Sequence, residues 1–236
     1  MKKIALAALS VVMPLSMFAT TMTGNGKIAT EIRDVSRFSS IEMSGIGHLS
    51  VNRGEIFRVE VKLDSNLIDR YRTKVSGGVL SLGFEPGVAV NGVTSLEVEV
   101  TLPELERISL SGAAEARLQD AFQGKRFSVG ISGSGKLAGA LDYRSVEIDI
   151  SGAGSLFLDG RADDLSIGIS GSGDFSGASL ATESAKVSIS GTGTAKLRAR
   201  SRLEARISGA GSVKYFGNPT VAKRISGVGR VERLGD

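Results

Sequence analysis

Two carboxylates, Glu147 and Asp149, are the residues of this chain whose types and spacing best suit catalysis. They are two positions apart, so in a β-strand both side chains point to the same face. Two carboxylates held about 5 to 9 Å apart can act as acid and base in cleaving a glycosidic bond. Lys186 and Arg206 follow later in the chain as neighbouring bases. A polysaccharide lyase or hydrolase is therefore one candidate function.

The alternative interpretation is that Glu147 and Asp149 are solvated surface charges. Gly130 and Gly168 occupy the positions equivalent to Asp149 in the neighbouring repeats, and no aromatic residue is evident nearby to stack on a sugar. Charged side chains usually lie at the surface. We therefore expect no catalytic residues and keep Glu147 and Asp149 as the candidate binding residues.

Three other motifs fail on inspection of their residues. Gly130–Lys136 matches the GxxxxGK spacing of a phosphate loop, but Leu137 stands where Ser or Thr must hold magnesium, and no helical pattern follows. His48 is the only histidine in a chain without cysteine, which is too few ligands for the usual zinc site. A calcium repeat needs a column of carboxylates, and the equivalent column holds only Asp174. The sequence predicts no metal and no cofactor.

The elements that would position these residues follow from a repeat. An apolar residue followed by Ser-Gly-small-Gly occurs six times, from Ile131–Gly135 to Ile225–Gly229. The repeated serines are Ser132, Ser151, Ser170, Ser190, Ser208 and Ser226, at separations of 18 to 20 residues. This period is typical of stacked β-coils. The serines are more simply explained by hydrogen bonds at their own corners than by nucleophilic chemistry.

Alignment on the serine predicts which side chains form the core, because side chains alternate along a strand. The positions directly before the serine, two residues earlier, and five residues after it are almost wholly apolar. They are Ile131, Ile150, Ile169, Ile189, Ile207 and Ile225; Val129, Ile148, Ile167, Val187, Ala205 and Lys223; and Leu137, Leu156, Phe175, Ala195, Val213 and Val231. The intervening column is polar or tiny and should face outward: Gly130, Asp149, Gly168, Ser188, Arg206 and Arg224. We predict an all-β, single-stack parallel β-helix with coils of about 18 to 21 residues, each completed by a polar return such as Asp159–Asp164.

The repeat also sets the expected domain organisation. Degenerate copies centred on Ser44 and Ser111 precede the six regular ones. We predict a single β-helix domain over residues 20–236, with less regular N-terminal coils at 28–105 and regular Ser-Gly-x-Gly coils at 106–236. Lys223 and the charged residues after it would cap the last coil.

Residues 1–19 are typical of a cleaved signal peptide: Lys2 and Lys3 precede an apolar stretch, Ile4–Val12, and a short exit region. The formal net charge of +4 falls to +2 without those two lysines, and the chain contains no tryptophan. These features predict an exported protein with no integral membrane segment after cleavage and no nucleic-acid partner.

The repeated Ile-Ser-Gly-Ser-Gly corners, Leu102-Pro103, and Tyr215–Pro219 followed by one more corner resemble the head GIN domain family of autotransporter adhesins. The resemblance covers Ile28–Gly235. It implies a right-handed parallel β-helix exported by a Gram-negative bacterium, to the periplasm or the cell surface. No functional residue carries over, because the motif shared with the family is structural.

We therefore expect an exported, non-catalytic β-solenoid that binds or adheres to a cell-envelope glycan or protein. The lyase or hydrolase remains the alternative. Ligand, partner, oligomeric state, handedness of the helix, the choice between periplasm and cell surface, and the precise cleavage site stay open at this point.

Overall fold

The computed structural model describes residues 20–235, and the predicted signal peptide at 1–19 lies outside the described residues. The N-terminal part holds β1 (Thr20–Thr23), β2 (Ile28–Arg33), β3 (Ser40–Gly45), β4 (His48–Arg53), β5 (Arg58–Asp64), the 3-10 helix η1 (Ile68–Arg70), β6 (Tyr71–Ser76), β7 (Val79–Phe84), β8 (Val88–Asn91) and β9 (Leu96–Leu102). The coils that follow hold β10 (Arg107–Gly112), β11 (Glu115–Leu118), β12 (Phe122–Gly133), β13 (Lys136–Gly152), β14 (Ser155–Gly171), β15 (Asp174–Gly191), β16 (Thr194–Gly209), β17 (Ser212–Phe216), β18 (Thr220–Gly227) and β19 (Arg230–Gly235).

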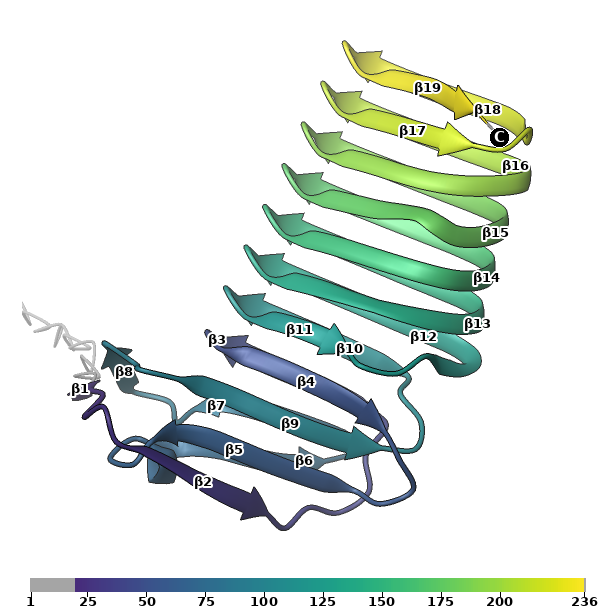
Figure 1. The fold of residues 1–236 in the computed structure, drawn as a ribbon. Coiled ribbons are helices and arrows are strands. Elements are labelled where there is room, and N and C mark those ends of the chain that lie inside the picture. The colour runs from purple at the N-terminus through teal and green to yellow at the C-terminus, as the bar shows by residue number, and fades with distance from the viewer. Residues whose placement is uncertain (1–19, 236) are drawn as a thin grey trace, which may run out of the picture.

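From β10 onward the chain winds as a stack of flattened coils, with sharp corners along one edge and rounded bends along the other (Figure 1). Neighbouring coils pair in parallel and in register, so each repeated serine lies opposite the next, as Ser151 does opposite Ser170. The prediction of a parallel β-solenoid is confirmed. The predicted polar return Asp159–Asp164 lies inside β14, because the backbone there pairs with the coils on both sides.

The corners require glycine at two positions for different reasons. Gly171, which follows the serine, has a φ of +115°, and a Cβ there would lie 2.6 Å from the carbonyl oxygen of Gly152 one coil below. Gly173 has an ordinary φ, but a Cβ would lie 2.4 Å from Cγ2 of Ile150. Only a residue without a Cβ allows both the backbone turn and the close stacking.

The predicted inward columns form the core of the regular coils. Ile131, Ile150, Ile169, Ile189 and Ile207 are each 2% exposed. In the last described coil the same position, Ile225, is 38% exposed, since no further described coil covers it. The column assignment is therefore correct, and burial is lost only at the end of the stack.

The N-terminal strands depart from simple winding. The coil formed by β3 and β4 lies between the coil of β10 and β11 on one side and strands β7 and β9 on the other, so spatial order differs from chain order. Strands β2, β5 and β9 pair antiparallel, as do β6 and β7. Gly77 and Gly78, with φ of +58° and +78°, make the two-residue turn between β6 and β7. Sequence reasoning had not predicted antiparallel strands here.

A buried carboxylate ties these strands together. Asp64 is 0% exposed and accepts hydrogen bonds from the backbone N–H of Gly26 at 2.7 Å and from the N–H and hydroxyl of Thr94 at 2.8 and 2.9 Å. Burial by itself would raise the pKa of the Asp64 carboxyl, but these hydrogen bonds and one from the Ser95 backbone outweigh it and hold the pKa below 3.8. The ionised carboxylate therefore fastens two loops to the end of β5.

Candidate functional site

The repeated serines form one outward ladder along the solenoid. Each serine is two positions beyond an outward residue on the same strand, so its side chain points to solvent. Parallel pairing aligns eight of them, all exposed: Ser44, Ser111, Ser132, Ser151, Ser170, Ser190, Ser208 and Ser226. At about 4.8 Å per coil the ladder is about 34 Å long.

The prediction that the repeated serines form hydrogen bonds at their own corners is wrong. Within residues 20–235, none of the hydroxyls of the six regular serines makes a hydrogen bond, and only Ser44 donates one, to the carbonyl oxygen of Leu82 at 3.3 Å. The reason is that the strand continues through the serine, and the turn begins only at the glycine after it. The serine hydroxyls are consequently free to bind a ligand.

A shallow groove follows this ladder, which we call the serine groove. It consists of two hollows, of about 440 and 540 Å³, that share Asp149 and Ser151. The first extends to Glu42 and Arg72, and the second extends to Arg224 and Ser226. The groove exists because the outward column beside the serines consists partly of small residues: Ser109, Gly130, Gly168 and Ser188.

Charge varies along the serine groove. Asp149 lies at the middle, and its Oδ1 extends over Gly168, where a Cβ would come within 2.7 Å of it. Arg206 and Arg224 line the half toward the last coil, whereas Glu42 and Arg72 line the opposite end. Among the described residues, Asp149 has no hydrogen-bond or ion-pair partner. A polar ligand lying in the groove would therefore meet a carboxylate at the centre and two guanidinium groups toward one end.

The residues considered for catalysis do not converge. Glu147 and Asp149 both lie exposed on β13. Glu147 pairs with Ser166 and Ser166 with Lys186, so the lysine is two coils away, about 10 Å. Arg206 is three coils from Asp149, about 14 Å. The arrangement brings Asp149 into the serine groove and leaves Glu147 outside its lining.

His48 lies on the opposite side of the corner, exposed on β4. Its Nδ1 is 3.7 Å from Glu115, and Lys136 donates a hydrogen bond to the same carboxylate at 2.9 Å. That hydrogen bond, with the charge of Lys136, lowers the pKa of Glu115. Across residues 20–235 no group of three or more His, Cys, Asp or Glu is placed to hold a metal ion.

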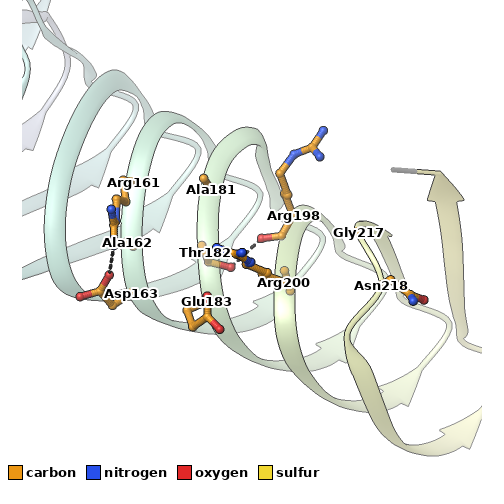
Figure 2. Close-up of a pocket in the computed structure, with 11 residues that line it drawn as sticks. Arg161, Ala162, Asp163, Ala181, Thr182, Glu183, Arg198, Arg200, Gly217 and Asn218 are labelled. Atoms are coloured by element: carbon orange, nitrogen blue, oxygen red, sulfur yellow. Dashed lines mark hydrogen bonds and ion pairs between the residues drawn. The ribbon is translucent and has the colours of Figure 1, made fainter.

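Another hollow, of about 480 Å³, lies at the rounded bends of β14 to β17, and we call it the bend pocket. Figure 2 shows the residues that line it: Arg161, Ala162, Asp163, Ala181, Thr182, Glu183, Arg198, Ala199, Arg200, Gly217 and Asn218. Sequence reasoning missed this pocket. The signal available was the change in coil length, from 20 residues between Ser170 and Ser190 to 18 between Ser190 and Ser208.

Fold and surface together define a β-solenoid with a long, open groove along its serine ladder. Residues 37–219 match the family described as "Putative auto-transporter adhesin, head GIN domain", and the chain belongs to this family. The resemblance noted in the sequence is thereby confirmed. Among proteins with curated descriptions, none matches this sequence.

Several solved structures share the fold. A "putative adhesin" from Bacteroides fragilis has a TM-score of 0.86 at 20% identity, over 90% of this chain and 100% of its own. A "putative adhesin" from Parabacteroides merdae has a TM-score of 0.75 at 23% identity, over 91% and 99%. A "putative lipid binding protein" from Parabacteroides distasonis has a TM-score of 0.77 at 20% identity, over 91% and 100%. At these identities the similarity shows the fold alone.

The family and these neighbours are named for adhesion or binding and none of them for an enzyme activity. Within the described part of the chain, no helix is long and apolar enough to cross a bilayer.

Proposed function

We propose that this protein is an exported, non-catalytic binding module of the adhesin type, which holds an extended glycan strand of the cell envelope in the serine groove. The N-terminal sequence supports export, to the periplasm or to the surface of a Gram-negative cell. The family name supports adhesion. The serine ladder supports an elongated ligand.

The observation that carries the proposal is the row of exposed serine hydroxyls, of which the six in the regular coils have no hydrogen-bond partner among residues 20–235. Each hydroxyl can donate one hydrogen bond and accept others. A single such contact exchanged with water adds little affinity, about 1 kcal/mol. A glycan chain that contacts one serine hydroxyl at every coil makes many such hydrogen bonds at once. The protein surface is rigid and therefore loses little entropy on binding.

The spacing of the charged residues favours binding over catalysis. The proposed bases are far from Asp149, the carboxylate at the middle of the groove. Lys186 lies two coils away and Arg206 three, so both are about 10 Å or more from it, beyond the reach needed for proton transfer. If the protein were a lyase or hydrolase instead, Asp149→Asn would abolish release of new reducing ends from envelope polysaccharide.

The test uses the mature chain and polysaccharide extracted from the cell envelope, with binding measured on immobilised glycan. In the groove variant, Ser170→Leu with Ser190→Leu places two large side chains on adjacent coils of the ladder. The control variant, Ser155→Leu with Thr194→Leu, places the same side chains at outward positions beyond the corner.

We expect the groove variant to bind at least about tenfold more weakly, which corresponds to 1.4 kcal/mol. The control variant should bind like the unmodified chain, and both should keep the native circular dichroism spectrum. Equal binding by both variants would contradict a glycan site in the groove. Binding of an extended peptide, but not of glycan, would assign the groove to a protein partner.

A further inference from the structure

The bend pocket arises from a mismatch in coil length. Relative to β16, strand β15 carries extra residues between Gly177 and Ala181, and their pairing shifts register there. The longer coil therefore projects beyond the shorter coils that follow it. The hollow lies beside this step, on the edge of the stack that carries the rounded bends.

The base of the pocket consists of small residues. Ala162 and Ala199 are 1% and 0% exposed, and Ala181 and Gly217 complete the surface between the coils. Thr182 donates its hydroxyl to the carbonyl oxygen of Arg198 and thereby holds two adjacent coils together. The buried alanines leave room for the hollow, and the exposed Ala181 supplies the apolar surface that can pack against the C–H face of a small ring.

The rim of the pocket is charged, and most of its charges already have partners. Arg161 forms an ion pair with Asp163 at 3.0 Å. Glu183 accepts a hydrogen bond from Ser201. Arg198 donates to the carbonyl oxygen of Ala178 at 3.2 Å, and its guanidinium lies 5.2 Å from the centre of the Phe216 ring.

Arg200 is different, because within residues 20–235 it forms neither a hydrogen bond nor an ion pair. In Figure 2 its side chain extends toward the coil of Thr182 and Glu183, whereas the Arg198 guanidinium points away from them. The lining contains three arginines and two carboxylates, so it has one surplus positive charge. Neither Arg198 nor Arg200 is paired with a carboxylate among the described residues, and Arg200 is the one whose guanidinium has no hydrogen-bond partner.

We propose that the bend pocket binds a sugar that carries one carboxylate, such as a uronic acid, with Arg200 as the carboxylate ligand. The planar guanidinium matches a carboxylate with two parallel hydrogen bonds. The Asn218 amide and the Glu183 carboxylate are placed on the rim to bind hydroxyl groups, and the exposed Ala181 is placed to contact the ring. This site is separate from the serine groove and does not depend on the function proposed for it.

The experiment titrates the isotopically labelled mature chain with three probes: glucuronate, methyl glucoside, which lacks the charge, and sulfate, which lacks the ring. Amide resonances near Arg161, Ala181 and Arg200 report on the bend pocket, and those of the serine corners report on the groove. Arg200→Gln removes the charge, Ala181→Leu fills the hollow at an exposed position, and Arg117→Gln is the matched control at an exposed arginine on β11.

We expect glucuronate to shift the resonances of the bend pocket, and methyl glucoside to bind there with at least about tenfold lower affinity. Arg200→Gln and Ala181→Leu should each lower the affinity for glucuronate at least about tenfold, and Arg117→Gln should leave that affinity unchanged. Sulfate binding as tightly as glucuronate would overturn the sugar assignment and leave a general anion site. Shifts confined to the serine corners, no shifts at all, or equal weakening by Arg117→Gln would overturn the proposal.

Discussion

The two ends of this solenoid close their cores in different ways. At the N-terminal end the chain folds back over the stack, and Leu67, Ile68 and Tyr71 in and around η1 are no more than 3% exposed. At the other end, Ile225 and Leu234 of the last described coil are 38% and 41% exposed. At the N-terminal end additional chain covers the core and finishes in the edge strand β2, whereas within residues 20–235 the last coil carries charged residues on an edge with no cover.

The difference shows that the repeat specifies the middle of the stack but not its ends. Each internal coil has neighbours that satisfy both of its backbone edges, so one short motif suffices. An end coil has one neighbour only. It needs either a cover with its own contacts, such as those of Asp64, or side chains that discourage another chain from adding to the edge.

The largest effect on stability should come from placing a charge in the inward isoleucine column, once in a central coil and once in the last described coil. Ile169→Asp buries an unpaired carboxylate in a central coil and should lower the free energy of unfolding by about 3 to 5 kcal/mol. Ile225→Asp, at the half-open end, should cost about 1 kcal/mol or less. Urea unfolding followed by circular dichroism measures both, and equal costs would show that the last coil is as well packed as the middle.

The corner glycines permit a similar comparison. Gly171→Ala introduces both an unfavourable φ and a Cβ 2.6 Å from a backbone oxygen, and should cost about 2 to 4 kcal/mol. Gly45→Ala has a positive φ of +94° but no atom within 4 Å of the new Cβ, so it should cost about 1 to 2 kcal/mol. The difference between the two unfolding free energies isolates the clash with the neighbouring coil. A difference near zero would contradict the stacking argument.

The regular coils could be predicted from sequence because their period places Ile131 and its equivalents on one face. The same alternation assigns Ser170 outward, but its place beside two glycines suggested a corner hydrogen bond that the extended backbone does not make. The Gly77-Gly78 pair was a usable hairpin signal within the N-terminal region. The spatial insertion of β3 and β4 between strands later in the chain had no local signal, because it depends on pairing across long separations.

The candidate sites were less predictable than the fold. The alternation of side chains along a strand places Glu147 and Asp149 on one face. Only the structure shows that, of these two residues, Asp149 alone lines the serine groove. Arg200 is one of many arginines in the sequence. Its position depends on a register shift in β15 and on the partners that its neighbours find, and neither can be deduced from spacing.

A third test concerns acid sensitivity of the covered end. The pKa of Asp64 is lower in the folded chain than its ordinary value of 3.8, so its contribution to stability is present above that value and is lost as the pH falls through the folded pKa. Asp64→Asn should therefore lower stability at neutral pH and reduce the loss of stability below about pH 3.8. Amide hydrogen exchange in β2 and β5 reports on this end directly. Glu147→Gln, at an exposed carboxylate, is the control and should leave the pH dependence unchanged.

The smallest effect on stability, and the most direct test of the open end, is expected from Lys223→Ile. Lys223 occupies an inward column position opposite Ala205, on the strand that forms the free edge. Isoleucine there would add apolar surface two positions before Ile225 in the same strand, and the edge that no described strand covers could then add a strand from a second copy. We expect dimers or larger species whose fraction rises with concentration in sedimentation velocity. Lys186→Ile adds the same side chain at an exposed position in a central coil. This variant should show the same association state as the unmodified protein. Equal association by both variants would mean that added apolar surface, and not the open edge, drives assembly.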